Sequence, residues 1–156
     1  MGDRTEDGEK TVATNRKARH DYELLERFEG GIKLTGDEVK SLRAGRASLV
    51  DAFGRVRDGE VWLEGLHIPP YEQGDKRTHQ PLRPRKVLLH RREIDGISRD
   101  LAEKGLSLVP LRLYFTHGMA KVEVAVARGK RRYEKRQSIA KREAEREIER
   151  AAGRRR

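Results

Sequence analysis

The sequence predicts a mainly β fold, a small antiparallel barrel or sandwich with short helices and a basic C-terminal tail. Short apolar runs with two-residue alternation recur between residues 22 and 127, and turn signals separate them. Residues 129–156 hold twelve Lys and Arg against five Glu, whereas the whole chain of 156 residues carries a net charge of +10. A nearly balanced body with a cationic arm is typical of proteins that bind polyanions, of which nucleic acid is the commonest in a cell.

The first part of the predicted body contains a strand and a helix. Two-residue apolar spacing indicates a strand over 28–34, and the Gly30-Gly31 pair within it indicates a bulge or a close approach of two backbones. Thr35 stands three residues before Glu38, which is the spacing of a capping box. This spacing predicts a helix from about 36 to 44.

Two hairpins supply most of the predicted sheet. The stretch 48–68 turns at Asp58-Gly59, a dipeptide that favours a two-residue hairpin loop. A second pair of alternating runs, 106–115 and 120–127, is joined at His117-Gly118. The pattern of these runs does not choose between a barrel and a sandwich, although closing the sheet would remove its exposed edges.

A long loop and a second helix lie between the hairpins. Four prolines and many polar residues predict a loop over 69–84. A short apolar run over 87–89 follows, and by pattern alone its Leu88 belongs to the core. A helix is predicted over 91–104, ended by Gly105, because one face carries Ile94, Ile97 and Leu101.

These patterns divide the chain into three parts. Residues 1–18 are polar and are expected to be disordered. Residues 19–128 form the folded domain, and residues 129–156 form the tail. On a helical wheel the tail places most of its basic side chains on one side and small apolar ones opposite. We therefore expect it to be disordered when free and helical when its basic face meets phosphates.

The sequence offers little for an enzyme site. It contains no cysteine, no glycine-rich phosphate loop, and no pair of histidines at metal-ligand spacing. No secretory signal and no apolar run approaching a membrane span are present, so a cytoplasmic protein without a membrane, metal or cofactor partner is expected. From the residues alone, an RNA-binding adaptor, a structural ribosomal or initiation-type protein, and a metal-dependent nuclease all stay open.

Three segments carry a resemblance to a known family. They read GIKLTGDEVKSLRAGRASLVDAF, RPRKVLLHRREI and VAVARGKRRYEKR, and the likeness extends from about Asn15 to the C-terminus. In these segments the chain resembles the SsrA-binding protein (SmpB) family. The resemblance implies an OB-like antiparallel β-barrel with two or three short flanking helices and no enzymatic activity.

The resemblance also implies a role and its partners. Members of the family bind the tRNA-like domain of transfer-messenger RNA and deliver it to ribosomes stalled without a stop codon, which starts trans-translation. The tail occupies the decoding centre and the empty message channel, in contact with small-subunit ribosomal RNA. The other expected partner is elongation factor Tu, reached through the aminoacylated RNA, and the protein itself is expected to be a monomer.

Carried over residue by residue, the resemblance gives two sets of RNA-binding positions. In the barrel they are Glu29, Leu88, His90 and Lys121. In the tail they are Gly129, Lys130, Arg131, Arg132, Tyr133, Glu134, Lys135, Arg136, Arg142, Arg146 and Arg150. Lys121 would neutralise a phosphate, the Glu29 carboxylate would accept hydrogen bonds, and the Tyr133 ring would stack on a base. Glu134 stands where the family usually has Asp, which keeps the charge and lengthens the side chain.

Overall fold

The computed structural model describes residues 9–74, 76–130, 143–144, 146–148 and 150. No helix in these ranges is long and apolar enough to cross a membrane. Along the chain the elements are β1 (Lys10–Thr14), α1 (Ala18–Asp21), β2 (Tyr22–Ile32), α2 (Gly36–Arg43), β3 (Phe53–Arg57), β4 (Glu60–Glu64), β5 (Arg85–Leu88), α3 (Arg91–Lys104), β6 (Ser107–Thr116) and β7 (Met119–Gly129).

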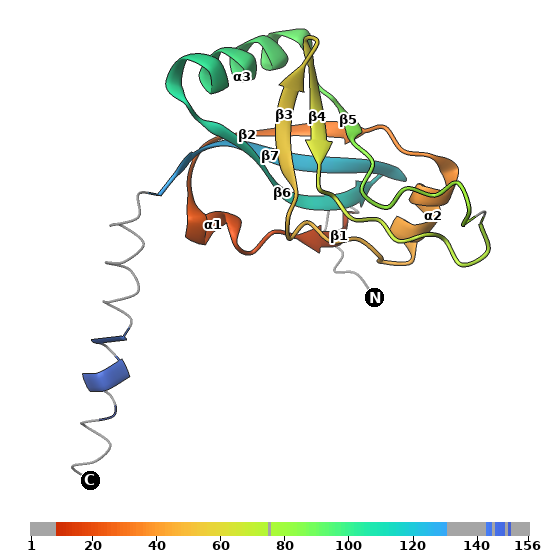
Figure 1. The fold of residues 1–156 in the computed structure, drawn as a ribbon, viewed down its shortest axis with the longest axis horizontal. Coiled ribbons are helices and arrows are strands. Elements are labelled where there is room, and N and C mark those ends of the chain that lie inside the picture. Colours follow the sequence, from red (N-terminus) through yellow and green to blue (C-terminus); the bar gives the residue numbers. More distant parts are fainter. Residues whose placement is uncertain (1–8, 75, 131–142, 145, 149, 151–156) are drawn as a thin grey trace.

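The strands close into an antiparallel barrel (Figure 1). Pairing runs from β6 through β3, β4, β5 and β2 to β7, and β7 pairs back with β6. The first strand, β1, pairs with the part of β6 that lies beyond its contact with β3. The prediction of a barrel with short flanking helices is thereby confirmed.

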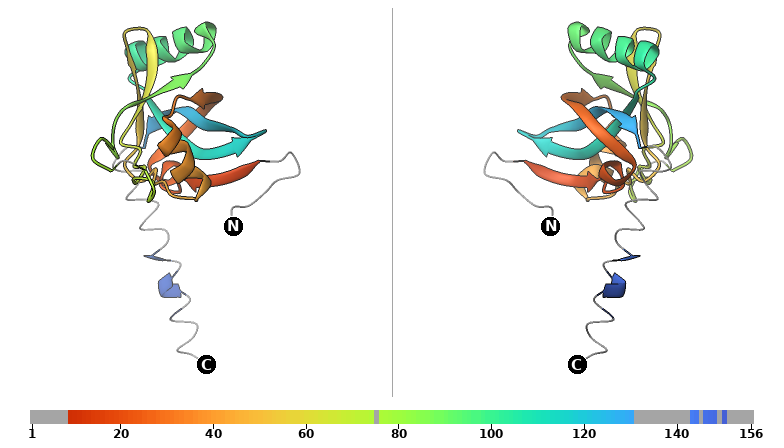
Figure 2. Two further views of the ribbon diagram at one scale, coloured as in Figure 1. Left: turned by 90° about the vertical axis from the view of Figure 1, so that its right-hand side faces the viewer. Right: turned by 90° about the vertical axis from the view of Figure 1, so that its left-hand side faces the viewer.

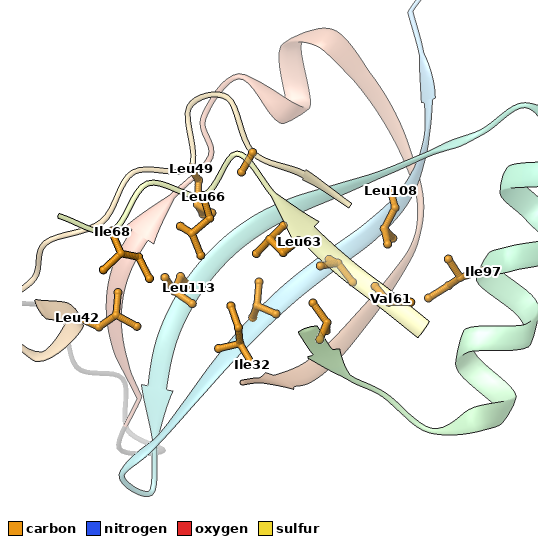
Figure 3. Packing of buried hydrophobic residues seen from close by; sticks show 14 of the residues in the cluster. Ile32, Leu42, Leu49, Val61, Leu63, Leu66, Ile68, Ile97, Leu108 and Leu113 are labelled. Carbon is orange, nitrogen blue, oxygen red and sulfur yellow. The ribbon is translucent and has the colours of Figure 1, made fainter. Parts of the chain in front are cut away.

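The interior of the barrel is an apolar core that both longer helices extend. Val61 and Leu63 are fully buried between the strands, as the two-residue alternation of this run predicted. Ile97 of α3 packs at one end and Leu42 of α2 at the other (Figure 3). The side views show α3 lying across its end of the barrel (Figure 2). Each such side chain stabilises the fold by about 1.5–3 kcal/mol through burial.

The turn chemistry read from the sequence is present in the structure. Asp58 and Gly59 both adopt positive φ, 54° and 73°, which matches the right-handed twist of the β3–β4 hairpin. Thr35 caps α2 by accepting a hydrogen bond from the Glu38 backbone, and the Glu38 side chain accepts one from the Thr35 backbone. The predicted helix and hairpin are both confirmed.

The glycine pair in β2 marks a close approach of two strands. A Cβ on Gly30 would lie 2.8 Å from the carbonyl oxygen of Leu88 in β5. A Cβ on Gly31 would meet only the Leu88 side chain, at an ordinary 3.6 Å. The sequence predicted either a bulge or a close approach of two backbones at this pair, and Gly30 makes a close approach.

The N-terminal part of the chain differs from the prediction. Disorder was expected for residues 1–18, but Lys10–Thr14 form β1, and Ala18–Asp21 form α1. Thr and Val are good strand formers, and Val12 and Ala13 pack against the core once β6 supplies hydrogen-bond partners. Residues 1–8 lie outside the described residues.

A buried ion cluster ties α2 to β5. Glu38 and Arg85 are 2% and 0% exposed, and Arg85 donates hydrogen bonds to the Glu38 carboxylate and to the carbonyl of Leu66. Arg83, from the end of the long loop, donates to the other carboxylate oxygen. Burial by itself would raise the pKa of Glu38, but the hydrogen bonds from Arg83, the Thr35 backbone and Arg85 outweigh it and lower the pKa.

Candidate nucleic-acid interface

Three of the four barrel residues predicted to bind RNA lie on one outer face. Leu88 of β5 is opposite Gly31 of β2, which is opposite Lys121 of β7. Glu29 lies two residues before Gly31, and because side chains alternate along a strand, it projects from the same face. Neighbouring strands are about 4.8 Å apart, so Leu88 and Lys121 flank a floor about 10 Å wide with no side chain at Gly31.

Leu88 is not a core residue. Its side chain is 52% exposed, whereas the preceding Val87 is fully buried. The core assignment suggested by the local pattern is therefore wrong, and the surface position implied by the family resemblance fits the structure. An exposed leucine beside a glycine floor offers an apolar contact to a ligand.

His90, the fourth predicted barrel residue, lies just after β5 at the start of α3. It is exposed, and its backbone N–H donates to Glu93 Oε1 at 3.0 Å, which caps the helix. It lies two residues beyond Leu88, at the margin of the face rather than on a strand of it.

Charge on this face is mixed. Among the described residues no ion pair forms at Lys121, whose ammonium is therefore available to a phosphate. Glu123, two residues along β7, lies 3.7 Å from Arg27 and 3.9 Å from Arg112. The face thus presents the ammonium of Lys121, unpaired within the described part of the chain, near an exposed carboxylate, Glu29.

The sequence analysis missed the residue that contacts Glu29. Tyr114 of β6 is 1% exposed, and its hydroxyl donates a hydrogen bond to Glu29 Oε2. Burial, followed by the hydrogen bond and charge of Glu29, raises the pKa of Tyr114 above its usual value, so the phenol stays protonated. Only the register between β2, β7 and β6 reveals this pair, because the two residues are 85 positions apart.

The root of the tail is fixed to the barrel. Gly129 is the last residue of β7 and pairs with Tyr22, so the predicted disordered tail does not begin there. Lys130 donates from its backbone to the Asp21 carbonyl at 3.0 Å and from Nζ to the Arg19 carbonyl at 3.2 Å. The chain is held at this point because carbonyls of α1 lie beside the end of β7 and accept these hydrogen bonds.

Besides Gly129 and Lys130, two further tail residues predicted to bind RNA fall in the described residues. Residues 143–144, 146–148 and 150 are helical, and Arg146 and Arg150 are exposed there. They are one helical turn apart and so share a face. The remaining tail predictions lie outside the described residues: Arg131, Arg132, Tyr133, Glu134, Lys135, Arg136 and Arg142.

The outer face of β7 connects the two sites. Lys121 and Gly129 are eight residues apart on the same face, which corresponds to about 26 Å along a strand. Between them Ala125 and Ala127 lie in a small apolar cluster with Ala18 of α1. One strand therefore links the Lys121 end of the face to the tail root.

Comparison with known proteins points to one family. The family model described as SmpB protein matches residues 12–154. The SsrA-binding protein of Acidothermus cellulolyticus is 61% identical over 150 residues, covering 96% of this chain and 94% of its own. The SsrA-binding protein of Mycobacteroides abscessus is 56% identical over 155 residues, covering 99% and 98%.

A solved structure points to the same family. A chain reported under the description "tmRNA-SmpB: a journey to the center of the bacterial ribosome" is 48% identical, with a TM-score of 0.65, and the match covers 81% of this chain and 92% of that one. The matched region of the sequence includes every barrel and tail position discussed above. The chain belongs to the SmpB family of SsrA-binding proteins.

Proposed function

We propose that this protein is an RNA-binding adaptor that binds the tRNA-like domain of transfer-messenger RNA and delivers it to stalled ribosomes for trans-translation. The observation that carries the proposal is the grouping of Leu88, Glu29 and Lys121 on one outer face of the barrel. Sequence separates these residues by up to 92 positions, and the barrel brings them together. The SsrA-binding relatives and the tmRNA–SmpB structure support the choice of RNA.

Each residue of the face has a distinct part in the proposed contact. Lys121 binds a backbone phosphate, which supplies affinity without sequence information. Leu88 packs against an apolar part of the RNA, such as a base or a ribose face. Glu29 repels phosphate but accepts a hydrogen bond, so it selects a place where the RNA presents a donor.

The tail is proposed to act on the ribosome. Its basic helical face, which includes Arg146 and Arg150, meets ribosomal RNA phosphates in the decoding centre and the empty message channel. Tyr133 stacks on a base there, and Lys130 is held to α1 of the barrel by a hydrogen bond. This role requires no chemical step by the protein.

A charge reversal tests the barrel part of the proposal. Lys121→Glu should weaken binding of a tRNA-like-domain transcript by tenfold or more and lower the slope of log affinity against log salt by about 1. Lys104→Glu is the matched control, because Lys104 lies exposed at the end of α3, away from the face. Equal affinities for the two variants would contradict the proposed interface.

The nature of the co-purified RNA separates this role from that of a structural ribosomal protein. Protein isolated from cells should carry one dominant tRNA-like transcript. Ribosomal RNA in constant proportion under all growth conditions would contradict the adaptor role.

A further inference from the structure

The hydrogen bond between Tyr114 and Glu29 joins a buried side chain to an exposed one. Tyr114 is 1% exposed, whereas Glu29 is exposed on the outer face of β2. A buried phenol usually has a hydrogen-bond partner. Here the partner is a carboxylate of the proposed RNA face. Tyr114 is directly opposite Lys121 and so projects from the same outer face, which ties the position of Glu29 to a covered side chain of that face.

The geometry makes Tyr114 reach across β7. Tyr114 pairs with Lys121 on β7, while Glu29 pairs with Glu123 on the same strand. The tyrosine side chain therefore extends diagonally across β7, from the register position of Lys121 to that of Glu123, where Glu29 lies. It thereby holds the carboxylate of Glu29 through its hydroxyl.

A second layer of contacts holds the tyrosine ring. The Arg112 guanidinium lies over it, 3.9 Å from the ring centroid. Arg112 in turn donates to Glu9 Oε2 at 3.0 Å, next to the start of β1. Strand β1 pairs directly with this part of β6, with Thr11 opposite Tyr114. The ring is thus enclosed by the arginine and the N-terminal strand.

Glu29 is consequently fixed before any ligand arrives. Its Oε2 is engaged by Tyr114, and no other described residue forms a hydrogen bond with Oε1. A side chain that is already ordered loses less conformational freedom on binding. The free oxygen can accept one hydrogen bond, from a base amino or imino group or from a ribose 2′-hydroxyl.

We propose that Tyr114 is a positioning residue of the RNA interface, which fixes the Glu29 carboxylate so that Oε1 accepts a hydrogen bond from a base or ribose donor of the RNA, and that Arg112 and Glu9 hold Tyr114 in place. The inference rests on the proposed function, because it takes the RNA of that function as the ligand.

A double-mutant cycle on the full-length protein tests the proposal. Affinities for the tRNA-like-domain transcript are measured for wild type, Tyr114→Phe, Glu29→Gln and the double variant. We expect Tyr114→Phe to weaken binding about threefold to tenfold, Glu29→Gln to weaken it by at least as much, and the double variant to bind like Glu29→Gln. Tyr71→Phe is the control, since it removes a surface hydroxyl bonded to Gln73.

The salt dependence separates the loss of this hydrogen bond from the loss of a phosphate contact. Neither Tyr114 nor Glu29 contacts a phosphate in this proposal, so Tyr114→Phe should leave the salt slope at its wild-type value, unlike Lys121→Glu. If the losses of the two single variants multiply in the double variant, Tyr114 acts independently of Glu29 and the inference is overturned.

Two outcomes separate this inference from the proposed function. If the wild type binds the transcript and Tyr114→Phe binds it equally well, the positioning role fails and the proposed function stands. If the wild type does not bind the transcript, the proposed function itself fails. Should Tyr114→Phe not fold, Arg112→Gln and Glu9→Gln are used in the same cycle with Glu29→Gln, and each should lose its effect when Glu29 is already replaced.

Discussion

Glu38 is a carboxylate that folding removes almost completely from water. Two arginines and a backbone N–H surround its carboxylate, and Arg85 on the other side of the pair is fully buried. Charges taken out of water are tolerated only when each is paired and hydrogen-bonded, as they are here. Removing one charged side chain of this pair therefore leaves the other charge buried without a partner.

Replacing Glu38 by Gln is expected to destabilise the protein by about 3–5 kcal/mol, because the Arg85 guanidinium stays buried with no carboxylate. Urea unfolding followed by circular dichroism measures this. The control is Glu72→Gln, since Glu72 is 82% exposed and pairs with Arg46 at 3.8 Å, and it should change stability by less than about 0.5 kcal/mol. Unfolding of Glu38→Gln at the wild-type urea midpoint would contradict this reading of the cluster.

The stabilisation by Glu38 should depend on pH. Its pKa is lower in the folded protein than in the unfolded chain, so the stabilisation is complete above the unfolded pKa of about 4.3. It is lost as the pH falls through the folded pKa. The difference in unfolding free energy between wild type and Glu38→Gln should thus be constant from pH 7 to pH 5 and shrink in more acidic solution. A difference that grows on acidification would have the wrong sign.

At the scale of elements, local signals predicted local structure. The Asp58-Gly59 turn and the Thr35 capping box each operate within four residues, and both are present in the structure. Strand β1 was missed because its partner, β6, lies about 100 residues away, as the Lys10–Phe115 pairing shows. No pattern within Lys10–Thr14 distinguishes a strand that needs such a partner from a polar terminus.

The site was predictable only in part for the same reason. Leu88 resembles a core residue in its short apolar run, and only its register beside Gly31 shows that it faces outward. Family resemblance predicted Glu29 and Lys121, whereas the proposed part of Tyr114 depends on the pairing of three strands. Chemistry that arises from cross-strand register is not visible in spacing along the chain.

The close approach of β2 and β5 gives a prediction at this scale. Gly30→Ala places a Cβ 2.8 Å from the backbone oxygen of Leu88, so the strands must separate, at a cost of about 1–3 kcal/mol. Gly31→Ala is the adjacent control, with a 3.6 Å contact to a side chain, and should leave the urea midpoint nearly unchanged. Equal destabilisation by the two variants would show that strand spacing is not the cause.

At the scale of the molecule, β7 links the two proposed interaction sites. Its Lys121 end belongs to the proposed RNA face, and its Gly129 end belongs to the tail root, about 26 Å away. Hydrogen bonds from Lys130 to α1 make the root a fixed point from which the tail departs. In the proposed function the barrel is a spacer between the RNA face and the segment proposed to enter the ribosome.

Truncation after Lys130 tests this division most directly, because it removes the tail and keeps the hydrogen bonds of its root. The shortened and full-length proteins are compared in transcript binding, at about 0.15 M salt with excess poly(A), and in peptide tagging on stalled ribosomes. The account predicts that the shortened protein still binds the transcript specifically but supports no tagging. Loss of specific transcript binding, or tagging at the full-length level, would contradict it.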